Sequence, residues 1–112
     1  MEQKDIELVK NRIRKGFPEV LKGNVRKIII YGSCARGDFD DDSDIDVAVL
    51  TECSREAAKV YDSDLMDIVT EIAMQSDAIV EYVCIPYDEY QEKKDWYGYF
   101  KNIERDGVLI YG

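Results

Sequence analysis

Six aspartates fall within nine residues of this chain, inside the stretch YGSCARGDFDDDSDIDVAVL at residues 31–50. The last two, Asp44 and Asp46, flank Ile45 and lead into an apolar run. Because successive side chains of a β-strand point to opposite faces, Asp44 and Asp46 share one face, roughly 7 Å apart at their Cα atoms. Two carboxylates on one open face can converge on a hard divalent cation, for which Mg²⁺, Mn²⁺ and Ca²⁺ are the candidates.

A third metal ligand is expected from a neighbouring strand. The segment AIVEYVCI at residues 78–85 reads as a strand in which Glu81 is the only charged interior residue. A carboxylate in the middle of a strand is costly unless it finds a cation or a partner. Glu81 is therefore the candidate third acid beside Asp44 and Asp46.

A phosphate-binding element is predicted just before the acidic run. Gly32 and Ser33 follow an apolar strand and open a short helical turn, whose free N–H groups suit a phosphate. Glycine lets a ligand approach the backbone, and Arg36 can add positive charge to the same phosphate. A phosphate cradle and a carboxylate metal site some ten residues apart indicate metal-assisted phosphoryl or nucleotidyl transfer.

Each of these features also has a purely structural explanation. A Gly-Ser pair after a strand is usually a turn, an acidic loop is usually a solvated surface, and an Asp-x-Asp pair often only caps a strand. Glu81 alone could be a solvent contact on an edge strand. What favours a functional site is that all of them occur in the order, and on the faces, that one site would need.

Two other motifs fail on their spacing. An EF-hand loop beginning at Asp38 would have Ser43 in place of the required glycine and Val49 in place of the final glutamate. A Walker A loop needs a Gly-Lys-Ser/Thr triplet, which the sequence lacks. The calcium-loop and Walker interpretations are excluded.

The composition limits the class of protein. At 112 residues with 46% apolar and 35% charged residues, the chain is expected to form one globular domain over residues 1–112. A net charge of −9 argues against direct binding to nucleic acid, and no apolar run is long enough to span a membrane. The absence of histidine excludes imidazole zinc sites and Ser-His-Asp catalysis. Three cysteines without a CxxC spacing predict reduced thiols in a cytoplasmic protein.

The apolar periodicity predicts a small α/β (α+β) domain, with a mixed sheet of three or four strands and helices mainly on one face. A first helix over residues 2–15 is expected to break around Gly16 and Pro18. The expected strands are 25–31, 45–50, 78–85 and, less strongly patterned, 108–111. The expected later helices are 54–72, with a kink near 62–64, then 88–94 and 97–105.

The motif residues resemble a known family. Gly32-Ser33, followed after ten residues by Asp44-Ile45-Asp46, resembles the signature of the DNA polymerase β-like nucleotidyltransferase superfamily. The fuller string GSCARGDFDDDSDIDVAVL looks like its small prokaryotic branch, the minimal nucleotidyltransferase (MNT) domains of HEPN/MNT toxin–antitoxin pairs. The ending FKNIERDGVLIYG also looks like that of these domains, so the resemblance covers nearly the whole chain.

The resemblance implies a role for each motif residue. Gly32 and Ser33 would hold the triphosphate, with Arg36 contacting phosphate or fixing the acidic loop. Asp44 and Asp46 would bind Mg²⁺ or Mn²⁺, and Glu81 is assigned as the third catalytic and metal-binding acid, where the family more often has aspartate.

The implied reaction is transfer of a nucleoside monophosphate, usually AMP from ATP, to a hydroxyl. In the toxin–antitoxin branch the acceptor is a tyrosine of the partner HEPN ribonuclease. A chain of this size leaves no room for a second, acceptor-binding domain, so the acceptor is expected on a partner or on a second copy. Two alternatives stay open: an antitoxin that neutralises its partner by binding alone, and a small nucleotidyltransferase that modifies an aminoglycoside.

Overall fold

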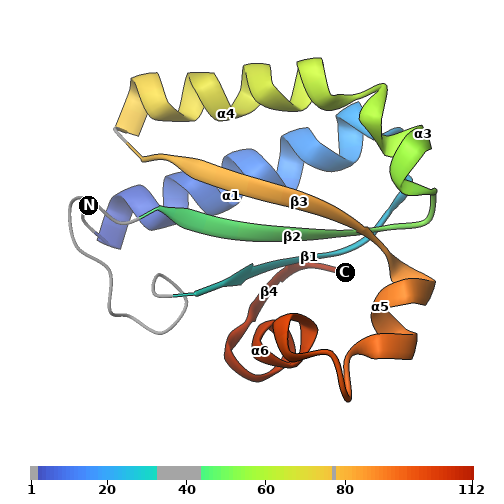
Figure 1. Cartoon of the computed structure of the whole chain (residues 1–112). Helices are drawn as coiled ribbons and strands as arrows, with labels where there is room; N and C mark the ends of the chain where they lie inside the picture. The colour runs from blue at the N-terminus through green and yellow to red at the C-terminus, as the bar shows by residue number, and fades with distance from the viewer. Residues whose placement is uncertain (1–2, 33–43, 77) are drawn as a thin grey trace.

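The computed structural model describes residues 3–32, 44–76 and 78–112 (Figure 1). These form one four-stranded sheet with helices on both of its faces. The elements in chain order are α1 Gln3–Val20, β1 Val25–Tyr31, β2 Ile45–Thr51, α3 Arg55–Lys59, α4 Asp62–Ser76, β3 Val80–Pro86, α5 Tyr87–Lys93, α6 Gly98–Asp106 and β4 Val108–Tyr111.

The sheet is mixed, with strand order β3-β2-β1-β4. Strand β1 pairs antiparallel with both β2 and β4, whereas β2 pairs parallel with β3. A parallel pair needs a crossover connection, and α3 and α4 supply it between β2 and β3. The predicted small α/β fold with a mixed sheet is confirmed.

Helices α1 and α4 cover one face of the sheet (Figure 1). Their apolar side chains pack on Ile45, Val47 and Val49, which lie on the face of β2 opposite Asp46. Helix α1 crosses α4 at Gly16, where an added Cβ would lie 2.8 Å from the Ile68 Cδ1 atom. Glycine at this position therefore lets the two helices approach closely.

The predicted break of the first helix around Gly16 and Pro18 was wrong, because α1 continues to Val20. Phe17 and Leu21 extend the four-residue apolar spacing and are fully buried, so continuing the helix adds two large side chains to the core. Pro18 lies in the last turn, where the helix needs to continue only two residues beyond it. Burial outweighs the local cost of the proline.

Helices α5 and α6 pack on the second face, beneath the sheet in Figure 1. Their buried side chains Tyr90, Phe100 and Ile103 contact the alternate sheet residues, such as Ala48 and Leu50. Helices thus cover more of this face than the sequence predicted. On this face, near the beginning of β2 and β3, Asp46 is half-buried and Glu81 is exposed, and the candidate site lies there.

The predicted crossover helix is two helices. Ser54 caps α3 by accepting a hydrogen bond from the Ala57 N–H, at 3.1 Å, and α4 begins at Asp62, within the predicted kink. Strand β4 returns to the outer edge of β1, and Arg14 Nε of α1 donates to the Ile110 carbonyl of β4 at 2.7 Å. None of the helices in the described ranges has the length and apolarity needed to cross a membrane.

Candidate active site

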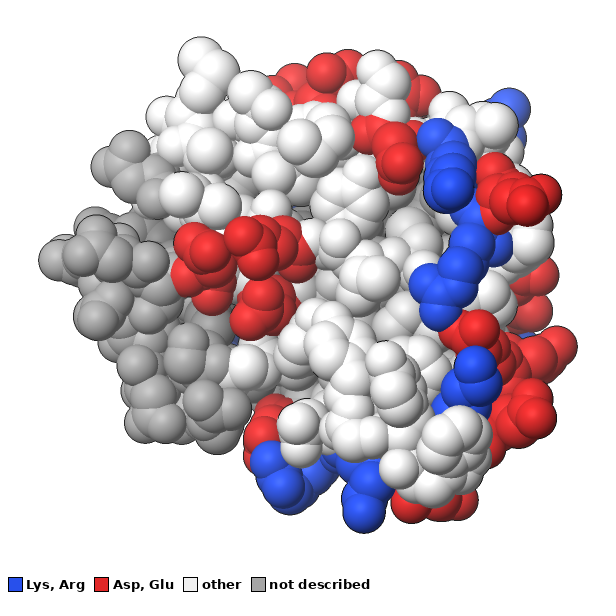
Figure 2. Space-filling model, viewed as in Figure 1, with Lys and Arg blue, Asp and Glu red and all other residues white. Residues whose placement is uncertain are grey.

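The acidic site is built on three neighbouring strands. Tyr31 at the end of β1 is the register partner of Asp46 in β2, and Asp46 is the register partner of Glu81 in β3. These three residues form one row across the sheet, on the α5/α6 face, at the end of that face where β2 and β3 begin. Figure 2 shows a compact group of acidic side chains at the end of the molecule where β2 and β3 begin.

Asp44 and Asp46 occupy the positions that strand alternation predicted. Ile45 between them is fully buried on the α1/α4 side, whereas both aspartates are half-buried. The Ile45 N–H donates to the Ile79 carbonyl at 2.8 Å, which ties the start of β2 to the start of β3. This hydrogen bond fixes the register that brings Glu81 beside the aspartates.

The electrostatics of the site are those of carboxylates crowded together. The negative charge of Asp44 raises the pKa of Glu81, and a side-chain hydrogen bond with Asp44, partial desolvation and the charge of Asp46 raise it further. Burial raises the pKa of Asp46, with a contribution from the charge of Asp44. None of the three carboxylates forms an ion pair with a lysine or arginine of the described ranges.

Gly32 is held against Asp46. Its φ of +79° is in the left-handed region that glycine adopts without strain. A Cβ added there would lie 2.6 Å from Asp46 Oδ2, closer than real Cβ contacts, so any side chain would displace the carboxylate. The glycine predicted to admit a phosphate therefore also makes room for a site carboxylate. Ser33 and Arg36, the other predicted phosphate-binding residues, lie outside the described residues.

Two tyrosines to which the sequence analysis assigned no role, Tyr31 and Tyr99, border the site. The Tyr31 hydroxyl shares a hydrogen bond with the Tyr99 hydroxyl of α6, and the two rings meet edge to face at 6.0 Å. Desolvation raises the pKa of Tyr31 most, followed by the hydrogen bond with Tyr99 and the charges of Tyr99, Asp46 and Glu81. Tyr31 directly precedes Gly32, but only the register between β1 and β2 reveals that it faces Asp46.

The donor atoms suit a hard cation. Carboxylate oxygens are ligands for Mg²⁺ and Mn²⁺, and a cation would relieve the mutual repulsion that raises the pKa values of Asp46 and Glu81. Within residues 3–32, 44–76 and 78–112, however, no group of three or more acidic or cysteine side chains is arranged to hold a metal ion. The carboxylates are neighbours, and the three-ligand metal site stays a prediction.

The two cysteines of the described ranges, Cys53 and Cys84, take no part in this site. Cys53 and Cys84 are free thiols, as the sequence predicted for them, and Cys34 lies outside the described residues. Burial raises the pKa of Cys84 to about 11, with smaller contributions from Asp62 and Cys53. At neutral pH the Cys84 thiol is therefore protonated and a poor nucleophile.

These features define an α/β domain with an acidic site at the open end of its sheet. The chain belongs to the nucleotidyltransferase domain family, whose model matches residues 10–106. This confirms the resemblance to nucleotidyltransferases and the predicted enzyme class.

Two proteins of Methanocaldococcus jannaschii are similar in sequence. "Putative protein adenylyltransferase MJ0604" is 24% identical over 111 residues, which cover 98% of each chain. "Putative protein adenylyltransferase MJ0141" is 40% identical over 47 residues, which cover 42% of this chain and 46% of that protein.

Solved structures share the fold. A toxin–antitoxin with AMP-PNP has a TM-score of 0.56 at 20% identity, covering 92% of this chain and 73% of that one. A mutant of the toxin–antitoxin MntA–HpeT has a TM-score of 0.55 at 16% identity, covering 96% and 73%. Both likenesses support the same arrangement of helices around a mixed sheet.

Proposed function

We propose that this nucleotidyltransferase transfers AMP from ATP to a hydroxyl group in a metal-dependent reaction, and that the acceptor is a tyrosine of a partner HEPN-domain toxin. The observation that carries the proposal is the strand register that places Asp46 beside Glu81, with Asp44 close enough to raise the pKa of Glu81. The names of the two archaeal relatives, and the AMP-PNP and toxin–antitoxin in the structural neighbours, support the nucleotide and the partner.

The site residues divide between metal and phosphate. Asp44, Asp46 and Glu81 would hold Mg²⁺ or Mn²⁺, whose role when bound is to neutralise phosphate charge and to lower the pKa of the attacking hydroxyl. Gly32 lies on the β1 side of Asp46, opposite Glu81, so we place the triphosphate on the β1 side. Ser33 and Arg36 would complete its binding.

The reaction joins the acceptor oxygen to the α-phosphorus of ATP and breaks the bond from that phosphorus to the bridging oxygen, so pyrophosphate leaves. The acceptor hydroxyl gives up its proton in this step. Glu81 is exposed at the side of Asp46 away from Gly32, where an acceptor can approach, so we assign it to take that proton.

The first test is calorimetric titration of ATP with Mg²⁺ into the wild type and an Asp44→Asn/Asp46→Asn variant. We expect binding that needs both the metal and the aspartates. An Asp64→Asn/Asp67→Asn variant removes the same charge from the exposed surface of α4 and should bind ATP like the wild type. Absence of binding at millimolar ATP and Mg²⁺ would refute the catalytic proposal and favour an antitoxin that acts by binding alone.

The second test concerns the acceptor. A HEPN protein encoded beside this chain would be mixed with it, ATP and Mg²⁺, and its mass followed. A gain of one AMP, mapped to a tyrosine and lost with the Asp44→Asn/Asp46→Asn variant, is the expected result. Tight complex formation without a mass gain would instead support the binding-only antitoxin. The same proposal places the protein in the cytoplasm, where it acts on the toxin as a monomer or as a homo-oligomer.

A further inference from the structure

Strand β3 is an edge of the sheet with backbone groups directed outward. The Ile79 carbonyl accepts from β2, so Ile79 and every second residue after it direct their backbone groups toward β2. The alternate residues, Val80, Tyr82 and Cys84, direct theirs away from the sheet, and the Cys84 carbonyl accepts from Arg55 on that side at 3.4 Å. No described strand pairs with this edge, which leaves it able to accept an added strand.

A groove of about 530 Å³ runs along this edge. Its floor is β3 itself, and its wall comes from α3 and the first turns of α4. The wall includes Ala58, Met66 and Asp62. Met66 is half exposed, and Asp62 accepts a hydrogen bond from the Tyr82 hydroxyl at 3.1 Å. The groove is mostly apolar, and its charged lining residues are Arg55, Lys59, Asp62 and Glu81.

The two ends of the groove carry opposite charge. Glu81 lies at one end, beside Asp44 and Asp46. Arg55 and Lys59 of α3 line the other part, and Arg55 reaches the strand at Cys84. Figure 2 shows a group of acidic side chains on one side of an uncharged stretch of surface, and basic side chains with acidic ones among them on the other.

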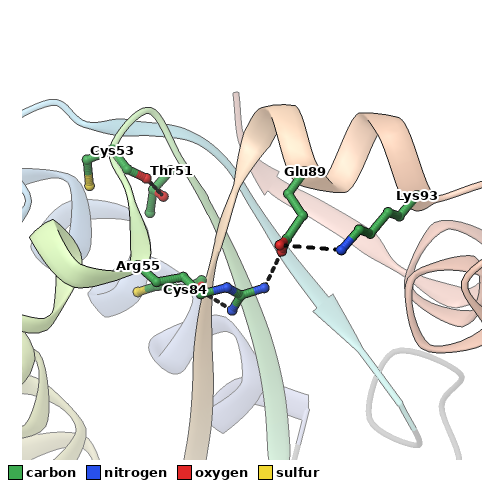
Figure 3. Close-up of polar contacts among 6 residues, drawn as sticks. All are labelled: Thr51, Cys53, Arg55, Cys84, Glu89 and Lys93. Carbon is green, nitrogen blue, oxygen red and sulfur yellow. Dashed lines mark hydrogen bonds and ion pairs between the residues drawn. The ribbon is translucent and has the colours of Figure 1, made fainter.

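The α3 end of the groove carries two cations, Arg55 and Lys59. Arg55 pairs with Glu89 of α5, and Lys93 approaches the same carboxylate at 3.6 Å (Figure 3). One glutamate is thus shared by two cations, while Lys59 has no ion pair with a described residue. This end of the groove favours a carboxylate on whatever occupies it.

We propose that this groove binds the acceptor: an extended segment of the partner protein adds to the outer edge of β3, with its hydroxyl residue at Glu81 and an acidic residue at Arg55 and Lys59. The inference rests on the proposed function and specifies how its acceptor docks. Backbone hydrogen bonds to Val80 and Tyr82 would supply affinity, as in other strand additions. The charge gradient would set which way the segment runs.

The geometry also fixes a spacing. Glu81 and Cys84, where Arg55 contacts the strand, are three residues apart, which is roughly 10 Å at the usual rise per residue. An added strand has the same rise. The preferred acceptor should therefore carry its acidic residue three or four positions from the modified hydroxyl residue.

The test uses a degenerate library of nine-residue peptides with one fixed tyrosine, incubated with the protein, Mg²⁺ and ATP, after which AMP-modified peptides are sequenced. We expect enrichment of Asp or Glu three or four positions from the tyrosine. In an Arg55→Glu/Lys59→Glu variant that preference should reverse to Lys or Arg. A Lys101→Glu variant, at an exposed position of α6, should keep the wild-type preference.

A second measurement tests strand addition itself. The best peptide is resynthesised with N-methyl groups on alternate backbone amides. One set of alternate positions should abolish AMP transfer and the other should preserve it, because only every second amide of an added strand faces β3. Equal effects of both sets would overturn the proposal.

The remaining outcomes separate this inference from the proposed function. Transfer to peptides without a positional charge preference, or with one that Arg55→Glu/Lys59→Glu leaves unchanged, overturns the docking surface alone. Loss of ATP binding in that variant, measured without any peptide, would mean that the groove holds nucleotide. Self-association that this variant abolishes would assign the groove to a second copy. If wild-type protein binds no ATP, the proposed function itself fails.

Discussion

Replacing Gly32 with alanine tests the contact between the phosphate-binding glycine and the site carboxylate. The substitution has two costs. A non-glycine residue in the left-handed region costs about 1–2 kcal/mol, which at roughly 4 °C per kcal/mol for a domain of this size lowers the melting temperature by about 4–8 °C. The second cost arises because the new Cβ would lie 2.6 Å from Asp46 Oδ2, so the carboxylate must leave its position.

Gly23→Ala separates these costs. Gly23 has a φ of +80°, almost the same as Gly32, but nothing lies within 4 Å of its added Cβ. In both variants the left-handed backbone conformation should lower the free energy of unfolding by the same amount, about 1–2 kcal/mol. Gly32→Ala should lower it by about 0.5–1.5 kcal/mol more, because Asp46 is forced off its rotamer. Urea denaturation measures this difference directly.

A double-mutant cycle identifies Asp46 as the cause. In an Asp46→Ala background the clashing carboxylate is gone, and Gly32→Ala should then cost no more than Gly23→Ala. ATP and Mg²⁺ affinity, measured by calorimetry, should fall at least tenfold in Gly32→Ala, equivalent to about 1.4 kcal/mol, and stay unchanged in Gly23→Ala. If both glycine variants lose equal stability and both keep wild-type affinity, Gly32 and Asp46 are not in contact as described.

Two further predictions concern stability. Burial and the charge of Asp44 raise the pKa of Asp46, so the charged form of Asp46 destabilises the fold at neutral pH, and this cost disappears as the pH falls through the raised pKa. Without ligands, Asp46→Asn should therefore have a higher melting temperature than wild type at pH 7, and the difference should shrink toward pH 3 in a series of fluorescence melting curves. A difference that does not depend on pH would contradict this origin. Gly107→Ala should lower the free energy of unfolding, measured by urea denaturation, by about 1–3 kcal/mol, because its Cβ would lie 2.4 Å from the Ile29 side chain. Gly98→Ala, which has open space around its Cβ, should leave the free energy of unfolding unchanged or raise it slightly.

Local patterns predicted much of the fold. Strands 25–31 and 108–111 have the bounds that the structure shows, and alternation correctly placed Asp44 and Asp46 on the face opposite Ile45, because period-2 alternation is a property of the strand alone. The end of α1 was mispredicted because the break signals at residues 16–18 are local, whereas the burial that overrides them comes from the sheet and α4.

The candidate site could be predicted only in part, because it depends on the register between neighbouring strands. Glu81 was a candidate from its cost in mid-strand, but its place beside Asp46 depends on the β2–β3 register, which the sequence does not state. Tyr31 and Tyr99 were missed for the same reason, since their contact joins β1 to α6 across 68 positions. A glycine that accommodates a carboxylate looks, in sequence, like any glycine that ends a strand.

The place of β4 has a consequence for the order of folding. Strands β1 and β2 are separated only by the acidic segment, so their pairing can form while the rest of the chain is still being synthesised. The other edge of β1 can pair only after residues 108–111 have been synthesised. The hydrogen bond from Arg14 to the Ile110 carbonyl likewise joins residues 96 positions apart. Contacts of such separation close late, so a nascent chain exposes the backbone edge of Ile28–Ile30 until its last strand arrives. During that interval this edge is where we expect the protein to aggregate or to need a chaperone.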